Sequence, residues 1–262
     1  MRCQIAEKYK EYGGALHTNT GIENILLNGK KAEGILLENG KKVEADYVIC
    51  ACDTDYSFRK LLPEKYMPIG LKKMYENSEK YPVSSGFQIA HAVDGIFPEL
   101  TGTGGFFCDE MKVENQSVQC MSIQSYDYEP DFAPAGKMIL QTNFSQSEVD
   151  YKYWESIYTD KTVYGKKKTE IAEQVLKREV KEYLFLEEII YVIDVGSPMT
   201  YARYCNSYRV YMSFVTTKQA KSITVPEVVK GLDNVLLASQ WLMESGGLPT
   251  AVAMEKFVRE EL

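Results

Sequence analysis

Histidine is scarce in this chain of 262 residues, which carries only His17 and His91. A Ser-His-Asp triad would have to use one of them, and the segment Met243–Gly247 lacks the leading glycine of a nucleophile elbow. The six cysteines show no CxxC spacing and are dispersed along the chain. The sequence therefore predicts no metal site, argues against a hydrolytic triad, and points to no catalytic residue.

Long apolar runs are also lacking. No stretch reaches the roughly 18 apolar residues that a membrane span needs, and the N-terminus has no hydrophobic signal core. We therefore expect a cytoplasmic protein with reduced cysteines. Acidic residues outnumber basic ones by 37 to 30, and the resulting net charge of −7 argues against nucleic acid as a partner. Peripheral contact with a membrane and association between copies are left open.

The rest of the chain is organised around the stretch from Asn234 to Phe257. Its apolar run Val235–Ala238 predicts a buried strand. Gly246 and Gly247 then precede a helix with an apolar stripe. Two glycines at a helix N-terminus let a ligand approach backbone N–H groups, where the helix dipole favours negative charge. An equally open interpretation is a plain strand–loop–helix that closes a domain.

The first fifty residues predict a helix, a meander and a buried strand. A helix over residues 2–12 should end at Gly13-Gly14, and a strand should follow at 15–18. Asn28-Gly29 and Asn39-Gly40 are hairpin turn signals, so residues 22–46 predict a three-stranded meander. The apolar run Tyr47–Cys50 is typical of a strand inside a parallel sheet.

The middle of the chain predicts an α+β layer. Asp53 or Thr54 should cap a short helix, and His91 should be a packed core residue because it alternates with Phe87 and Ile89 on one face of a strand. Gly102–Phe107 is interpreted as a loop, and residues 166–168 as the solvated end of a long helix. The predicted helices are within 65–81 and at 148–158 and 166–185, and the predicted strands are 83–93, 117–124, 137–144 and 188–195. The helix over 166–185 should be amphipathic, with Ile171, Val175, the stem of Arg178 and Leu184 near one face.

Three blocks of the sequence, Thr20–Ala51, Ser197–Phe214 and Asn234–Phe257, carry a resemblance. In this order they resemble the phytoene desaturase-type FAD-dependent oxidoreductases of the amine oxidase superfamily. The resemblance implies an α/β fold combined with α+β. Residues 1–52 and 229–262 would form a partial, glutathione-reductase-like FAD-binding domain, and residues 53–228 an inserted substrate-binding domain with a mixed β-sheet and helices.

The resemblance also implies a set of flavin contacts. The backbone of Ile22 would hold the adenine, and Ala51 would lie near the ADP moiety. Gln240 would lie near the ribityl or pyrophosphate group. Trp241 would flank the flavin ring or cap the pocket, with a core aromatic as the equal alternative. The backbone N–H groups of three residues would face the flavin pyrimidine edge: Gly246, Gly247 and Leu248.

The activity implied by the resemblance is hydride transfer at flavin N5, which desaturates, saturates or isomerises a hydrophobic, polyene-like substrate. The glycine-rich dinucleotide fingerprint of the family is absent, because Gly102–Phe107 has Phe107 in place of the third glycine. We therefore expect a fragment or truncated product that binds FAD weakly or not at all and is inactive alone. The alternatives are a cofactor-free module that binds a hydrophobic ligand or a partner, and an amine oxidase with an aromatic pair over the flavin.

Overall fold

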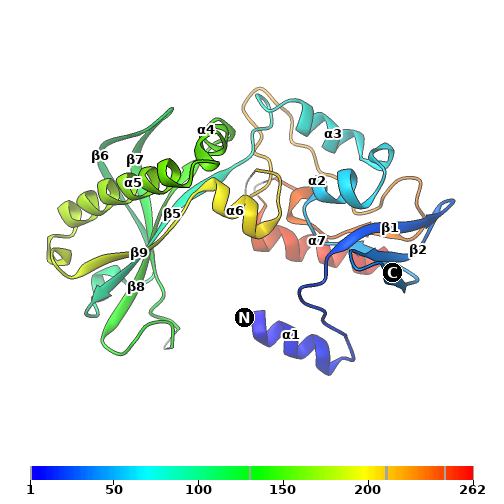
Figure 1. Ribbon diagram of the computed structural model, residues 1–262, viewed down its shortest axis with the longest axis horizontal. Helices are drawn as coiled ribbons and strands as arrows, with labels where there is room; N and C mark the ends of the chain where they lie inside the picture. Colours follow the sequence, from blue (N-terminus) through cyan, green and yellow to red (C-terminus); the bar gives the residue numbers. More distant parts are fainter. Residues whose placement is uncertain (1, 130, 210–211, 245, 262) are drawn as a thin grey trace.

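The chain folds into two lobes (Figure 1). The computed structural model describes residues 2–129, 131–209, 212–244 and 246–261. The helices are α1 (Arg2–Glu11), α2 (Thr54–Tyr56), α3 (Ile69–Glu76), α4 (Glu148–Tyr158), α5 (Lys161–Glu182), α6 (Pro198–Cys205) and α7 (Gly247–Glu261). The strands are β1 (Ile22–Asn28), β2 (Lys31–Leu37), β3 (Lys42–Glu44), β4 (Val48–Cys50), β5 (Ser85–Asp94), β6 (Thr103–Val113), β7 (Gln116–Ser125), β8 (Lys137–Gln146), β9 (Ile190–Gly196) and β10 (Val235–Leu237).

The predicted meander is confirmed as the antiparallel sheet β1-β2-β3. Its first turn is shifted by one residue from the prediction, because Asn28 pairs with Lys31 and leaves Gly29 and Lys30 at the centre. Gly29 has φ +62° and Gly40 in the second turn has φ +81°. Glycine accepts these positive φ values without the steric cost that a side chain would add.

A second, two-stranded sheet joins a segment from the first fifty residues to a segment close to the C-terminal helix. β10 pairs with β4 in parallel, with Val235 opposite Val48 and Leu237 opposite Cys50. All three residues of β10 are buried, as the apolar run predicted. Ile49 of β4 remains 44% exposed, so this strand is covered less completely than one inside a larger parallel sheet.

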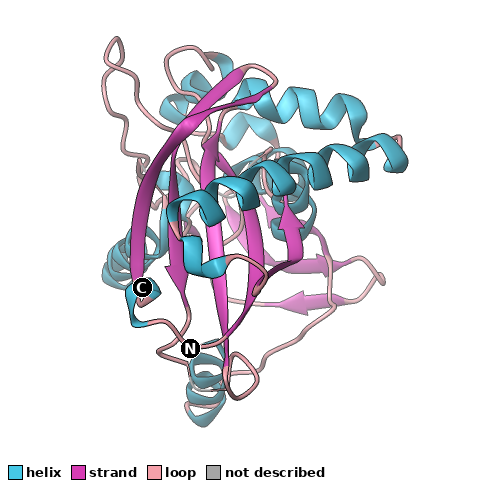
Figure 2. Ribbon diagram, turned by 90° about the vertical axis from the view of Figure 1, so that its left-hand side faces the viewer, coloured by secondary structure: helices cyan, strands magenta, loops and turns pink. Residues whose placement is uncertain are grey.

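The other lobe is a five-stranded sheet with the order β6-β7-β8-β5-β9. Every neighbouring pair is antiparallel, whereas a mixed sheet was expected. Helices lie across one face of the sheet (Figure 2), where Ile171 and Val175 of α5 pack against Phe87 and Phe144. His91 is fully buried in this sheet, which confirms its predicted core position.

The interpretation of Gly102–Phe107 as a loop is wrong, because Thr103 begins strand β6. Gly105 lies opposite Ser122 of β7, and a side chain there would approach the carbonyl oxygen of Met121 to 3.1 Å. These glycines therefore allow close strand pairing and cradle no phosphate.

Helix α5 begins at Lys161, five residues before the predicted start. The side chain of Asp160 accepts hydrogen bonds from Thr162 N and Val163 N, both at 3.0 Å, and so caps the helix. Residues 166–168 consequently lie inside α5, and Lys167 pairs with Glu114 at 3.0 Å. The prediction that these lysines form a solvated helix end is wrong.

The N-terminal segment corresponds only partly to the prediction. Helix α1 ends before Gly13 as expected, but residues 15–18 form no strand. The apolar side chains of α1 are largely exposed, with Ile5 at 61% and Tyr9 at 52%. The described residues thus leave this face of α1 uncovered.

The buried side chains form one large cluster in the first lobe and two smaller clusters in the second. The large cluster includes Ile25, Phe58, Phe214 and Met254. The segments around Phe58 and Phe214 therefore share a core with the two ends of the chain, although both lie within the predicted substrate domain. The boundaries predicted at 52/53 and 228/229 remain a prediction.

Candidate functional site

The carboxyl ends of β4 and β10 meet at one edge of their parallel sheet. Ala238 N donates to Cys50 O at 2.9 Å, which holds the two chain segments together immediately after the strands. Ala51, Gln240 and Trp241 follow directly, so the fold brings three of the predicted cofactor residues to this edge. Ligands of open α/β sheets bind at the carboxyl ends of the strands.

The Gly246-Gly247 turn lies between this edge and helix α7. Gly246 has φ +51° and Gly247 φ +84°, so both positions favour glycine. Gly247 N donates to Gln240 Oε1 at 2.6 Å, and Gly246 N donates to Met243 O at 3.4 Å. Two of the predicted flavin donors therefore already have partners within the chain.

The start of α7 places a further donor at the same end of the helix. The first N–H groups of any helix lack partners inside it, and Pro249 contributes none. The N–H group of Leu248 is therefore the donor that this helix start offers, and the side chain of Leu248 is 59% exposed. The dipole of α7 adds partial positive charge at this position.

Gly246→Ala is expected to destabilise the chain by about 1–3 kcal/mol. The added Cβ would lie 2.9 Å from Ser213 N while φ stays positive. Urea denaturation measures the loss. Gly165→Ala in α5 is the matched control, because its Cβ would meet nothing within 4 Å and should stabilise the helix by about 0.5–1 kcal/mol. A Gly246→Ala protein as stable as the unaltered chain would contradict the geometry.

Trp241 lies in a buried aromatic cluster with Tyr75, Tyr208 and Phe214. It is 2% exposed, and its ring centroid lies 5.4 Å from that of Phe214 and 6.5 Å from that of Tyr208. This is the core position that the sequence left as the alternative. Its role beside a flavin ring stays a prediction.

Asp53 has a second role that the sequence did not reveal. As predicted, its side chain caps the helix after β4, with Asp55 N donating to Oδ1 at 2.6 Å. Its Oδ2 also accepts from Tyr208 N at 2.6 Å, which joins two segments 155 residues apart. Burial raises the pKa of Asp53 to about 6. An acidic residue three positions after a predicted buried strand was the only signal in the sequence.

An ion pair connects the two lobes close to this cluster. Arg209, next to Tyr208, donates to Glu148 at the start of α4. Arg209 has φ +60°, and its guanidinium lies 4.8 Å from the centroid of the Tyr208 ring. The segment after α6 thus contacts Asp53 on one side and α4 on the other.

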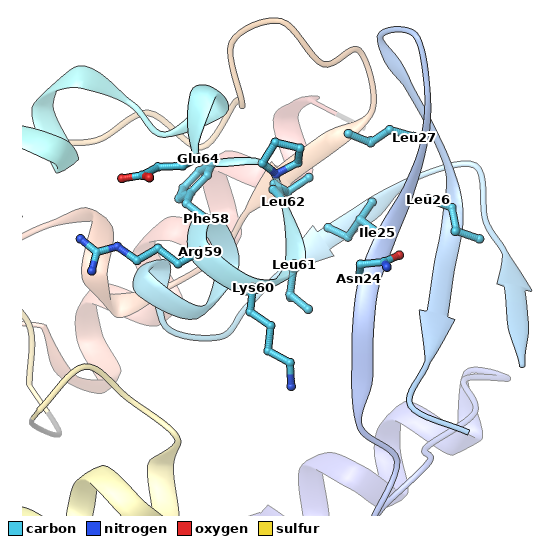
Figure 3. A pocket seen from close by; sticks show the side chains of 11 residues that line it. Asn24, Ile25, Leu26, Leu27, Phe58, Arg59, Lys60, Leu61, Leu62 and Glu64 are labelled. Carbon is cyan, nitrogen blue, oxygen red and sulfur yellow. The ribbon is translucent and has the colours of Figure 1, made fainter. Parts of the chain in front are cut away.

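Ile22 lies apart from the Gly-Gly turn, at the start of β1, where its carbonyl oxygen accepts from Tyr56 OH at 3.4 Å. A groove of about 680 Å³ lies between β1 and residues 58–64 (Figure 3). Ile25 points from β1 toward the segment that carries Leu61 and Leu62, and Arg59 points away from β1. None of the seven predicted cofactor residues lines this groove, so it is separate from the candidate site.

Among the described residues, no group of three or more His, Cys, Asp and Glu side chains is placed to hold a metal ion. Within the same ranges, every helix is too short or too polar to cross a membrane.

The sequence model of the family described as flavin-containing amine oxidoreductase matches residues 3–253. It thus includes every predicted cofactor residue.

Similar curated proteins carry names from carotenoid chemistry. A zeta-carotene-forming phytoene desaturase of Myxococcus xanthus is 33% identical over 35% of this chain and 17% of its own length. A chloroplastic prolycopene isomerase of Daucus carota is 26% identical over 76% of the chain and 32% of its own length. A 4,4'-diaponeurosporene oxygenase of Staphylococcus haemolyticus is 22% identical over 96% of the chain and 50% of its own length. The chain thus spans half or less of each relative.

Two solved structures share the fold. An oxidoreductase of Methanosarcina mazei superposes with a TM-score of 0.61 at 16% identity, over 97% of this chain and 52% of its own. A protein of Pyrococcus furiosus superposes with a TM-score of 0.55 at 11% identity, over 98% of this chain and 50% of its own.

Proposed function

This chain belongs to the flavin-containing amine oxidoreductase family, and we propose on that premise that it forms part of an FAD-dependent oxidoreductase for a hydrophobic, polyene-like substrate. The observation that carries the proposal is the start of α7 at the carboxyl edge of β4 and β10. A glycine turn, the backbone N–H of Leu248 and a helix dipole converge there.

The residues at this edge fit one half of a flavin site. A side chain at Gly247 would meet only Pro249, at 3.8 Å, so bare backbone faces open space beside the N–H donor of Leu248. This donor and the dipole of α7 would stabilise negative charge on the pyrimidine edge of the flavin. Bound FAD would supply the hydride chemistry. Gln240 would position the turn through its bond to Gly247 N, and Ile22 and Ala51 would lie toward the adenosine.

The phosphate half of the site does not fit these residues. A pyrophosphate needs a glycine-rich loop at a helix N-terminus. The sequence has no such fingerprint, and its nearest approximation is part of strand β6. We therefore propose that a glycine-rich βαβ unit outside these 262 residues completes the site, and that this chain binds FAD weakly alone.

FAD titration of the purified chain tests this proposal. We expect a dissociation constant above about 100 μM, measured by calorimetry and by quenching of flavin fluorescence. The full-length relative from Staphylococcus haemolyticus is titrated in parallel for comparison. A chain that purifies with stoichiometric FAD would overturn the weak-binding prediction and support the flavin assignment.

The polyene substrate rests on the names of the relatives, which come from carotenoid chemistry. Once the chain is joined to the N-terminal half of such a relative, loss or gain of conjugated double bonds is followed by visible absorbance. Hydrogen peroxide released from an amine would favour the amine oxidase alternative instead. If the joined protein binds no FAD, the partner-binding alternative gains support, consistent with the exposed apolar face of α1.

A further inference from the structure

A small pocket lies in the second lobe, where the end of α4, the first turns of α5, helix α6 and strand β9 meet. Its volume is about 200 Å³, and none of the predicted cofactor residues lines it. Tyr158, Tyr164 and Lys168 line one side, and Thr200 and Arg203 the other. We propose that this pocket binds a small oxyanion of the phosphate class.

Positive charge gathers at the pocket although the chain is acidic overall. Lys168 and Arg203 line it, and Lys161 lies 3.1 Å from the centroid of the ring of Tyr158, which also lines it. None of these three cations forms an ion pair with a described residue. Their neighbour Lys167, by contrast, pairs with both Glu114 and Glu170. In a chain of net charge −7, this local excess of unpaired cations favours an anionic ligand.

Aromatic rings hold these cations in place without neutralising them. Lys168 lies 5.4 Å from the centroid of the Tyr164 ring, and the Arg203 guanidinium 4.4 Å from that of Tyr204. A cation over a ring face is attracted by the ring quadrupole. Its N–H groups that point away from the ring remain free to donate to oxygen atoms.

The packing of the helices fixes the spacing of the pocket. Residues 161, 164 and 168 follow the i, i+3, i+7 spacing of one helix face. Tyr164 OH lies 2.7 Å from Ser197 Oγ at the N-cap of α6, which fastens α6 to α5. The two sides are thus held together before any ligand arrives, which lowers the cost of binding.

The size and the charge distribution narrow the ligand class. Pockets for drug-sized ligands or cofactors have volumes of roughly 300–1,000 Å³, so 200 Å³ suits a phosphate or diphosphate group better than a nucleotide or a polyene. Asp194 is the only carboxylate that lines the pocket, and its Oδ1 accepts from Val195 N at 2.8 Å. Its charge opposes an anion, so removing that charge should strengthen binding.

Calorimetric titration with inorganic phosphate and with pyrophosphate, at constant ionic strength, tests the proposal. Lys168→Gln/Arg203→Gln should weaken binding by at least about tenfold, whereas Asp194→Asn should tighten it. Lys166→Gln is the matched control, because it removes one positive charge from the opposite side of the same helix. Circular dichroism verifies that each variant is folded.

The anion can be a free phosphate or a lipid headgroup, and co-sedimentation with vesicles separates these sources. Vesicles of phosphatidylcholine alone are compared with vesicles that also contain an anionic phospholipid. Binding of free phosphate, or of the anionic vesicles alone, supports the proposal when Lys168→Gln/Arg203→Gln weakens it by at least about tenfold. No binding in either arm, or binding that the double variant retains, overturns it. No arm uses flavin, so the outcome is independent of the proposed function.

Discussion

Asn234→Asp is expected to destabilise the first lobe by about 3–5 kcal/mol at pH 7. Asn234 is 6% exposed, and its Oδ1 accepts from Ala32 N at 2.7 Å. Its Nδ2 donates to Ala32 O at 2.8 Å and also to Asp46 O. The aspartate would keep the acceptor but replace the donor with a second carboxylate oxygen. That oxygen would face two carbonyl oxygens in a buried site.

Asn39→Asp is the matched control, because it makes the same chemical change at an exposed turn. Asn39 Oδ1 accepts from Lys41 N at 3.0 Å, a bond that an aspartate can retain. Its effect should stay within about 0.5 kcal/mol. Urea denaturation at pH 7 measures both variants. An Asn234→Asp protein within about 1 kcal/mol of the unaltered chain would contradict the assigned hydrogen bonds.

This amide also matters for the candidate site. Asn234 immediately precedes β10, and its own carbonyl oxygen accepts from Val48 N at 3.0 Å. One residue therefore fastens the meander to both strands whose carboxyl ends carry Ala51 and Gln240. Weakening the hydrogen bonds of Asn234 should therefore disturb the proposed flavin half-site, although Asn234 is not one of the residues assigned to that half-site.

The sequence was sufficient where local chemistry decides the structure. Asn-Gly signals located the meander, although Gly29 rather than Asn28 takes the first central position of its turn. Strict alternation located β5 and the burial of His91. The Gly246-Gly247-Leu-Pro sequence located the start of α7, since two positive φ values followed by a proline favour a helix N-terminus.

The sequence was insufficient where distant partners decide. Gly102–Phe107 has the composition of a loop, yet β6 extends from Thr103 because β7 supplies hydrogen-bonding partners along it. Residues 15–18 have strand composition but no strand partner among the described residues. The hydrogen bond from Gly247 N to Gln240 Oε1 depends on the folded turn and could not be predicted from the sequence.

The sequence prediction missed one buried polar residue, Glu179, because it assigned the wrong residues to the end of the apolar stripe on α5. The predicted apolar stripe of α5 ran from Ile171 and Val175 to Arg178 and Leu184, but Leu184 is 73% exposed. Continuing the i, i+4 spacing from Val175 leads to Glu179, which is fully buried. The sequence contained this signal, although it gave no indication that His91 lies opposite.

Glu179 and His91 form a fully buried polar pair between α5 and β5. Glu179 Oε2 lies 3.2 Å from His91 Nε2, and Thr142 Oγ1 donates to Glu179 Oε1. Burial raises the pKa of Glu179 to about 7 and lowers the pKa of His91 to about 4. Both shifts disfavour charge in the core, so folding is linked to protonation at both residues.

The two shifts have opposite signs. The raised pKa of Glu179 contributes stability that is fully present below about pH 4.5 and is lost as the pH rises through about 7. The lowered pKa of His91 contributes stability that is present above about pH 6.5 and is lost as the pH falls through about 4. Between about pH 4.5 and pH 6.5, the stability lost at Glu179 and the stability gained at His91 offset each other as the pH rises. Above about pH 7, Glu179 is ionised in the core and its burial destabilises the fold to the full extent.

Glu179→Gln should therefore become progressively more stable than the unaltered chain as the pH rises from 5 to 8, by up to about 3 kcal/mol. The glutamine keeps an acceptor for Thr142 and presents its amide to His91, but it cannot ionise. Urea denaturation at both pH values measures the difference. Glu173→Gln, at an exposed position of α5, should give an offset within about 0.5 kcal/mol at either pH. A stability difference for Glu179→Gln that stays constant or shrinks toward pH 8 would show that the core tolerates this carboxylate in its charged form.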